Sequence, residues 1–280
     1  MAKLGANRYG KSRVRISRIT RLDDRHEFNE WTVHVMLHGD FASSFTEADN
    51  SKVLPTDTMK NTVYYVARGS KAATIEAFAM ELGDHFLDNN PQVSKVSILV
   101  EEKAWARMVV DGTPDATTFR MGGPEVNTVL AARAKGAPWE ITSGVDGLTI
   151  LKTTKSAFTG YIVDKLTTLK PATDRILGTC ATVEWDYSTG SPDYSQVRER
   201  ILAALLKVFA EHKSLSVQHT LYDMGKAALD VAPEIARIHL SLPNLHHLPA
   251  DLTPFGLDNP NHIFVPIDEP HGTIEATIER

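Results

Sequence analysis

The sequence has a single cysteine, no long apolar run and no excess of basic residues, and each of these shortages excludes a class of protein. Cys180 cannot form an intramolecular disulfide, and its strand-like neighbours favour a small buried residue over a nucleophile. No segment approaches the roughly 20 apolar residues that a membrane-spanning helix requires. The net charge of −5 argues against a protein that coats nucleic acid.

Targeting signals are also scarce. The N-terminal residues lack the apolar run of a signal peptide, and the C-terminal residues ATIER are not a peroxisomal tripeptide. We therefore expect a soluble cytoplasmic protein with no membrane or nucleic-acid partner. What is present is ordinary globular composition, with 42% hydrophobic and 23% charged residues in a chain of 280. This length suffices for one large domain or two of ordinary size.

The spacing of apolar residues predicts both strands and helices. Alternation predicts half-buried strands around Val14 and Ile16 and in KVSILV, ATVEWDY and RIHLSLP. A helical period appears in AATIEAFAMELGDHF and in YSQVRERILAALLKVFAEH, and a further helical piece is expected around DMGKAALDVAPEIA. Each long helix should lay one face on a sheet.

The polar, Gly- and Pro-rich residues 112–138 interrupt these patterns and are the expected boundary between two units, residues 1–137 and 138–280. In each half, strands precede a helical region and further strands follow it. The economical interpretation is a duplicated α+β unit, in which helices cover one face of an antiparallel sheet. The other face and the edges need burial, which favours assembly of several copies into a ring.

Two polar islands lie in the first half. Lys11, in RYGKSRVR, is either a solvated lysine at a strand entry or, if its charged form is disfavoured, a base. Thr56 and Asp57, in VLPTDTMKNT, can cap a helix. Together, beside the free N–H groups of a helix N-terminus, they could also hold an anion or a reacting oxygen.

Two more islands could recognise a flat heterocycle. Phe158 is by default a core aromatic and Arg175 a surface charge on a short helix, but a ring beside an arginine fork also suits a planar anion. Gln218 falls in an expected short strand of SLSVQHTLYDM. Its amide either sits half exposed or reads an adjacent carbonyl and N–H of a purine-like edge.

The last island, SLPNLHHLPADL, contains two adjacent histidines. Neighbours on a strand point to opposite faces, and no Cys, HExxH or paired acidic pattern accompanies them, so we predict no metal site here. His246 is instead a candidate member of a proton relay, because imidazole exchanges a proton near neutral pH. Pro243 fixes the backbone before Asn244 and would hold its amide in place.

Taken in order along nearly the whole chain, these motifs resemble those of the urate oxidase (uricase) family. The motifs are RYGK, ADNSKVLPTDTMKNTVYYVAR, GLTILKTTKSAFTGY with TTLKPATDRIL, SVQHTLYDM and SLPNLHH. The resemblance implies two tandem tunnelling-fold (T-fold) units per chain and a homotetramer with active sites at subunit interfaces. It also implies oxidation of urate by dioxygen and water to 5-hydroxyisourate and hydrogen peroxide, with no metal or organic cofactor.

The resemblance further implies how urate is bound. Arg175 and Gln218 would hold urate from opposite sides, Phe158 would stack on its face, and the backbone of Val217 would bind the same edge as Gln218. Leu245, where a basic residue is common, and residues 157–164, which lack a usual histidine or tryptophan, depart from the family pattern. By the resemblance, these departures are expected to bear on rim contacts, stability and affinity and not on the reaction type.

The catalytic roles are also implied by the resemblance. Thr56 and Asp57 would reach the substrate from a neighbouring subunit. Lys11, Thr56 and His246 would form the relay that removes a proton from urate, and Asn244 would border the space for dioxygen and water. The alternatives left open are another T-fold enzyme acting on a pterin or purine, such as a zinc hydrolase, and a purine-binding oligomer without activity.

Overall fold

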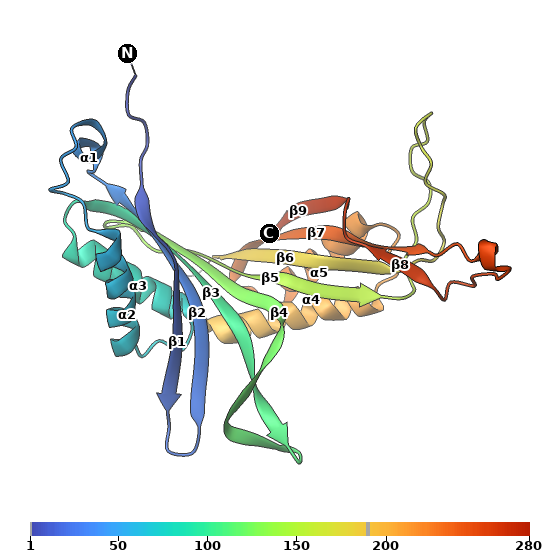
Figure 1. Ribbon diagram of the computed structural model, residues 1–280, viewed down its shortest axis with the longest axis horizontal. Helices are drawn as coiled ribbons and strands as arrows, with labels where there is room; N and C mark the ends of the chain where they lie inside the picture. Colours follow the sequence, from blue (N-terminus) through green and yellow to red (C-terminus); the bar gives the residue numbers. More distant parts are fainter. Residues whose placement is uncertain (1, 189–190) are drawn as a thin grey trace. The chain divides into compact units, whose positions relative to one another are not determined.

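The computed structural model describes residues 2–188 and 191–280, and the chain forms two compact units, Met1–Gly144 and Val145–Arg280 (Figure 1). The expected boundary at residues 137 and 138 lies shortly before this division. Each unit combines an antiparallel sheet with helices, so the predicted α+β class is confirmed. Within the described residues, no helix is both long and apolar enough to span a lipid bilayer.

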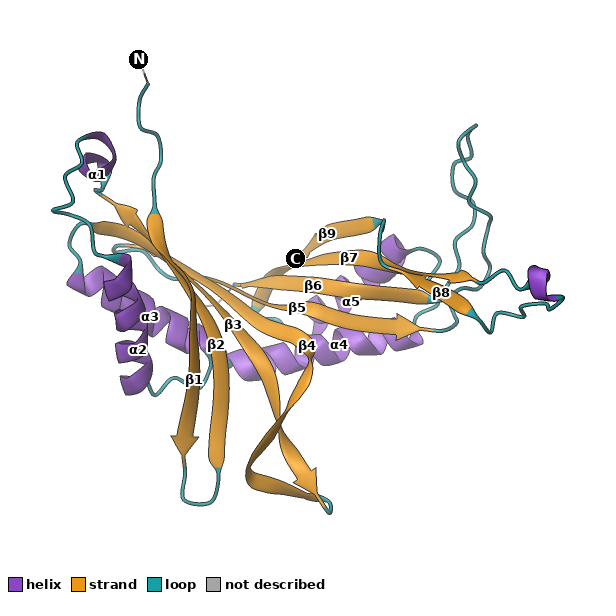
Figure 2. Ribbon diagram, in the orientation of Figure 1, coloured by secondary structure: helices purple, strands orange, loops and turns teal. Residues whose placement is uncertain are grey.

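The first unit is an antiparallel sheet whose one face is covered by helices (Figure 2). Its strands are β1 (Tyr9–Arg21), β2 (His26–Gly39), β3 (Val93–Val110) and β4 (Thr113–Ala134), and its helices are α1 (Ala42–Thr46), α2 (Thr56–Gly69) and α3 (Ile75–Asn89). Alternate residues of β2 and β3 are fully buried against Phe78 and Leu82 of α3. The indole of Trp31 stacks on Phe78, with ring centroids 4.6 Å apart. The strands and the helix predicted from periodicity in this half are confirmed.

The second unit also packs helices against an antiparallel sheet, and other strands form the edges of that sheet. Its elements are β5 (Glu140–Lys152), which begins just before the division, β6 (Leu177–Tyr187), α4 (Tyr194–Glu211), α5 (Val217–Val231), β7 (Ile235–Pro249), the short 3-10 helix η1 (Thr253–Phe255), β8 (Phe264–Ile267) and β9 (Thr273–Glu279). Strands β8 and β9 pair with different parts of β7. Apolar residues of β6 and β7 pack against Ile201 and Leu205 of α4.

The polar central stretch is a strand and not the irregular segment that its composition predicted. Asp111 and Gly112 have φ of 50° and 78°, the left-handed pair typical of a two-residue hairpin turn, and Val110 pairs with Thr113 across it. Register shifts between Lys103 and Trp105 and again before Val109 break the alternation of side chains. The bulges therefore hid the strand pattern.

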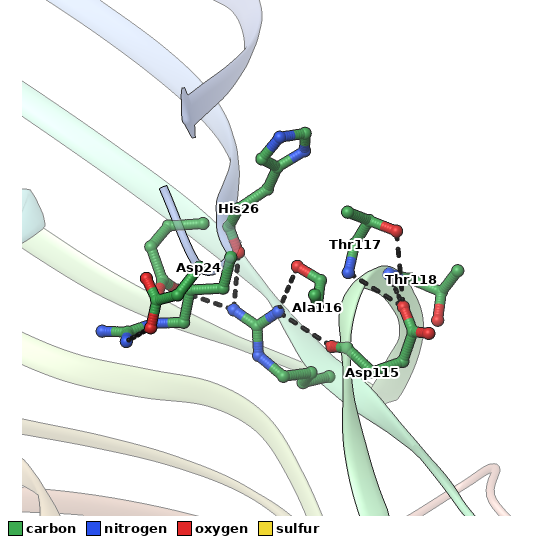
Figure 3. A network of polar contacts seen from close by, with 9 residues as sticks. Asp24, His26, Asp115, Ala116, Thr117 and Thr118 are labelled. Atoms are coloured by element: carbon green, nitrogen blue, oxygen red, sulfur yellow. Dashed lines mark hydrogen bonds and ion pairs between the residues drawn. The ribbon is translucent and has the colours of Figure 1, made fainter. Parts of the chain in front are cut away.

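Arg107 fastens the end of this hairpin to the start of β2 (Figure 3). Its guanidinium donates to the backbone oxygens of Asp115 and Ala116, at 3.0 and 2.8 Å, and to that of His26. The Asp115 carboxylate accepts hydrogen bonds from the amides of the two threonines that follow Ala116, and these bonds lower the pKa of Asp115. The hairpin end is thus held by charge-assisted bonds, together with the packing of Phe119 against Arg107 and Phe28.

The expected strand at Gln218 is a helix. Ser216 caps α5 by accepting from the amide of His219, and Val217 and Leu221 begin a buried stripe that continues along the helix. The polar residues after Val217 masked the start of this stripe. The helical piece expected around residues 223–236 is the continuation of the same helix, which ends at Val231.

Candidate active site

Lys11 lies on β1 immediately before an irregularity in the strand. The pairing of β1 with β2 is regular from Tyr9 to Lys11 and resumes at Val14, and Arg13 between them has φ of 60°. A bulge of this kind changes the direction of the neighbouring side chains. Gly10 is required here, because a Cβ at that position would lie 1.8 Å from the backbone oxygen of β2 residue Val35.

Thr56 and Asp57 form the first turn of α2, and neither of them caps it. The N-cap is Pro55, which has no side-chain capping bond, so the capping interpretation is wrong. The carboxylate of Asp57 turns along the helix instead, where it accepts from Lys60 and from Asn61. An acidic residue in the first turn still stabilises the helix through its dipole. Both side chains are exposed and available to a group outside the unit.

Tyr9 connects Lys11's strand to the chain that leads into Thr56. Its hydroxyl donates to the backbone oxygen of Leu54 at 3.1 Å and accepts from the amide of Leu54 at 2.8 Å. The pKa of Asp57 is lowered mainly by the hydrogen bond from Lys60, and the ammonium of Lys11 adds a smaller electrostatic effect. Lys11 is therefore within electrostatic range of the α2 N-terminus.

Phe158 and Arg175 meet in the second unit, in a loop and not on the expected short helix. Phe158 and Ala172 exchange two backbone hydrogen bonds of 2.8 and 3.0 Å, which fold the loop back on itself. The guanidinium carbon of Arg175 then lies 5.3 Å from the centre of the Phe158 ring, and Tyr161 stacks against the same ring at 4.9 Å. The predicted aromatic platform with its arginine is present.

The environment of Arg175 is unusual for a cation. Its side chain is half-buried, burial lowers the pKa of the guanidinium, and its Nε atom is buried without a hydrogen-bond partner in the described part of the chain. An arginine remains charged in such a place, so the unsatisfied donor carries a desolvation cost. Asp174 is already engaged by the hydroxyl of Thr154, 2.7 Å away.

The same loop is tied to the start of α5. The amide of Ala157 donates to the oxygen of Ser214 at 2.7 Å, and the amide of Ser214 donates to Lys155 at 2.9 Å. These bonds place the loop two residues before the Ser216 cap. Val217 follows the cap and is buried, while the side chain of Gln218 is exposed.

Helix geometry leaves the N–H groups of Val217 and Gln218 without acceptors inside α5. The first turn therefore offers two free donors together with the amide of Gln218. Phe158 and Arg175 belong to the loop that backbone hydrogen bonds attach just before this turn. These four predicted site residues thus come from two segments that are fastened to each other.

Asn244 and His246 lie two residues apart on β7 and so share one face of the sheet. The backbone N–H of Asn244 donates to the backbone oxygen of Gly272 at 2.8 Å, and the side chains of Asn244 and His246 are half-buried. Thr179, directly opposite Asn244 on β6, is 3% exposed, and its hydroxyl has no hydrogen-bond partner among the described residues. The sequence did not single out Thr179, because its alternating neighbours look like an ordinary strand.

The predicted site residues thus form two groups, one in each compact unit. Lys11, Thr56 and Asp57 belong to the first, and Phe158, Arg175, Val217, Gln218, Asn244 and His246 belong to the second. The adjacent histidines of β7 do not gather further metal ligands around them within the described ranges. A different cluster, His212 with His219 and Asp223, lies at the junction of α4 and α5 and was not predicted.

Comparison with known proteins identifies relatives along nearly the whole chain. The family model for uricase matches residues 7–132 and 141–275. The uricase of Arthrobacter globiformis is 43% identical over 277 residues, covering 99% of this chain and 90% of the relative. The uricase of Dictyostelium discoideum is 38% identical, covering 100% and 98%. The crystal structure of the Arthrobacter globiformis uricase matches with a TM-score of 0.94 at 42% identity, covering 100% of this chain and 96% of that chain.

Proposed function

Because the chain belongs to the uricase family, an oxidoreductase family with the T-fold, we propose that it oxidises urate with dioxygen and water to 5-hydroxyisourate and hydrogen peroxide. The reaction is balanced by these species alone. Urate gives up two electrons and a hydroxyl from water is added at C5, while dioxygen takes up two electrons and two protons. We further propose that no metal or organic cofactor takes part.

The observation that carries this proposal is the guanidinium of Arg175 beside the ring of Phe158. A desolvated cation with an unsatisfied donor favours an anionic ligand, because the ligand's charge and acceptors offset the cost of burial. The arginine fork makes two parallel hydrogen bonds to adjacent acceptors, and an aromatic ring packs on a flat ligand. Urate is both anionic and planar.

Gln218 and Val217 supply the opposite edge of the proposed site. The Gln218 amide offers one acceptor and two donors, which match an adjacent carbonyl and N–H of a purine. The free N–H of Val217 at the helix start donates to the same edge, where the α5 dipole favours negative charge. Urate would then be held between α5 and the loop that carries Arg175.

Proton removal is assigned to Lys11, Thr56 and His246. Lys11 and Thr56 belong to the first unit and His246 to the second, and we propose that a homotetramer joins them, with Thr56 and Asp57 reaching urate from a neighbouring subunit. In this arrangement Lys11 acts as the base, Thr56 passes the proton, and His246 completes the relay. The exposed first turn of α2 supports a role outside its own unit.

The remaining steps need positioning more than covalent help. The urate dianion passes one electron to dioxygen, the two radicals recombine at C5, and the proton returned by the relay gives a hydroperoxide. Loss of hydrogen peroxide leaves an electrophilic imine, and water adds to it to give 5-hydroxyisourate. Asn244 borders the space where dioxygen and then water are held, and controlled access of water keeps these steps in order.

A direct assay tests the proposal. Metal-free protein is mixed with urate while ultraviolet absorbance, dissolved oxygen and peroxide are followed. We expect loss of the urate absorbance with one oxygen consumed and one peroxide released per urate. Binding of urate without any change in absorbance would support a purine-binding oligomer instead, and activity that appears only when zinc is added would support a metal-dependent enzyme.

A further inference from the structure

A cluster of two histidines and one aspartate lies where α4 ends and α5 begins. His212 is the C-cap of α4, and His219 and Asp223 are four residues apart on α5. His212 Nδ1 lies 3.1 Å from Asp223 Oδ2, and His219 Nε2 lies 3.7 Å from the same oxygen. One potential ligand atom from each residue falls within 4.8 Å of the others.

Helix geometry explains why these groups converge. Residues four apart lie on the same face of a helix, so His219 and Asp223 are stacked one above the other. The tight connection between the helices, residues 212–216, brings His212 onto that face, and its ring meets that of His219 at 4.6 Å in an edge-to-face arrangement. The cluster therefore joins two separate helices and is not a chance pair along one of them.

The spacing is close to what a metal ion requires. Ligand atoms about 2.0–2.1 Å from a tetrahedral ion lie roughly 3.4 Å from one another. The distances of 3.1 and 3.7 Å lie on either side of that value. The side chain of His219 is 48% exposed and can adjust, while that of His212 is only 14% exposed and fixes one corner.

The surrounding charges leave the cluster suited to a cation. Asp223 supplies one carboxylate, and each imidazole can offer a ring nitrogen to a cation. Lys152 is a nearby cation that would repel a metal ion. Its ammonium, however, donates to the backbone oxygens of Phe209 and His212 at the end of α4. The negative end of the α4 dipole offsets the positive start of α5.

We propose that His212, His219 and Asp223 bind one divalent transition-metal ion per chain, with Zn²⁺ as the best match, and that the ion clamps α4 to α5. Two imidazoles and one carboxylate are a donor set that zinc accepts, with water completing the shell. The ion stabilises the junction and takes no part in the oxidation of urate.

The test measures metal binding without urate. Protein freed of metal is titrated with Co²⁺, whose visible absorption reports coordination, and with Zn²⁺ by calorimetry. We expect one ion per chain, and a rise in the midpoint of thermal unfolding of about 5 °C or more once free Zn²⁺ exceeds the Kd about 100-fold. His219→Ala and Asp223→Asn should each abolish the cobalt spectrum and the thermal shift.

Asp230→Asn is the matched control, because Asp230 is an exposed aspartate of the same helix that pairs with Lys226. It should bind metal like the unmodified protein. Unfolding midpoints without metal show whether each variant is folded. Metal binding that persists in the His219 and Asp223 variants, or no binding by the unmodified protein, overturns the proposal. Urate turnover is measured separately, so its failure and the failure of the metal site are distinguishable.

Discussion

The two groups of candidate site residues hold their cations in opposite ways. In the second unit, Arg175 is half-buried beside Phe158, and it has no ion-pair partner among the described residues. In the first unit, the carboxylate of Asp57 is exposed and already paired with Lys60, with Lys11 acting on it from farther away. The second group thus has a cation without an anionic partner, whereas in the first group Lys60 balances the charge of Asp57 at the surface.

This difference separates holding a substrate from moving a proton. A desolvated guanidinium gains most when an anion arrives, so Arg175 and the other urate-holding residues of the second group should determine affinity, whereas His246 of that group belongs to the proposed proton relay. Lys11, a half-buried lysine within electrostatic range of the α2 start, gains little from binding alone, so the first group should determine the rate. Variants in the two groups should therefore change different kinetic quantities, and that separation can be tested.

The largest effect is expected from Lys11→Met. The substitution removes the proposed base but keeps an aliphatic chain of similar length, so urate should still bind. We expect turnover to fall by about 10² or more, the scale of lost acid–base assistance, with urate affinity within about threefold of the original. Single-turnover kinetics and urate binding measured without dioxygen check the two quantities separately.

Lys71→Met is the control for Lys11, since Lys71 is an exposed lysine of the same unit. It should leave turnover and affinity unchanged. Unaltered turnover in Lys11→Met would remove Lys11 from the mechanism. A loss of affinity equal to the loss of rate would instead assign Lys11 to substrate holding and would erase the proposed difference between the two groups.

A smaller effect, on a different quantity, is expected from Arg175→Ala. The change deletes the charge-assisted hydrogen bonds to the anion, a net loss of about 1.5–3 kcal/mol once water has replaced the guanidinium. Urate affinity should fall about 10- to 100-fold, whereas turnover at saturating urate should fall less. Binding titrations and the dependence of the rate on urate concentration give both values.

Arg198→Ala is the matched control, because the guanidinium of Arg198 also lies over an aromatic ring of the second unit, 5.5 Å from the centre of Trp185. Its loss should lower stability without changing urate affinity. Normal affinity in Arg175→Ala would contradict the assignment of Arg175 to the substrate.

Periodicity alone predicted the elements that bury one regular face. The helices α3 and α4 follow it because residues such as Phe78 and Ile201 recur at helical spacing and are fully buried. The strands β6 and β7 follow it because Val183 and Leu240 alternate with polar neighbours. The site residues themselves were located by their motifs and not by any such period.

Other features depend on contacts between segments that the sequence does not display. Two register shifts concealed β4, although the Asp111–Gly112 pair is a hairpin signal that could have been used. The sequence predicts a strand at Gln218, and in a strand the four-residue spacing of His219 and Asp223 does not make their side chains neighbours. Only the helix makes the two side chains neighbours, and only the end of α4 adds His212.

The smallest effect is expected from Tyr9→Phe, which tests whether the first group depends on being held in place. The hydroxyl of Tyr9 satisfies both the amide and the oxygen of Leu54, two residues before Thr56. Its removal leaves two partly buried backbone groups unpaired and should lower the free energy of unfolding by about 1–2 kcal/mol. Turnover should fall up to about tenfold through misplacement of Thr56, with urate affinity unchanged.

Tyr65→Phe is the control, because Tyr65 is 73% exposed on α2, the helix that Thr56 begins. Thermal unfolding and steady-state kinetics check both variants. A Tyr9 variant that loses stability but keeps full turnover would show that the tether is structural only, whereas reduced affinity would place it with the second group.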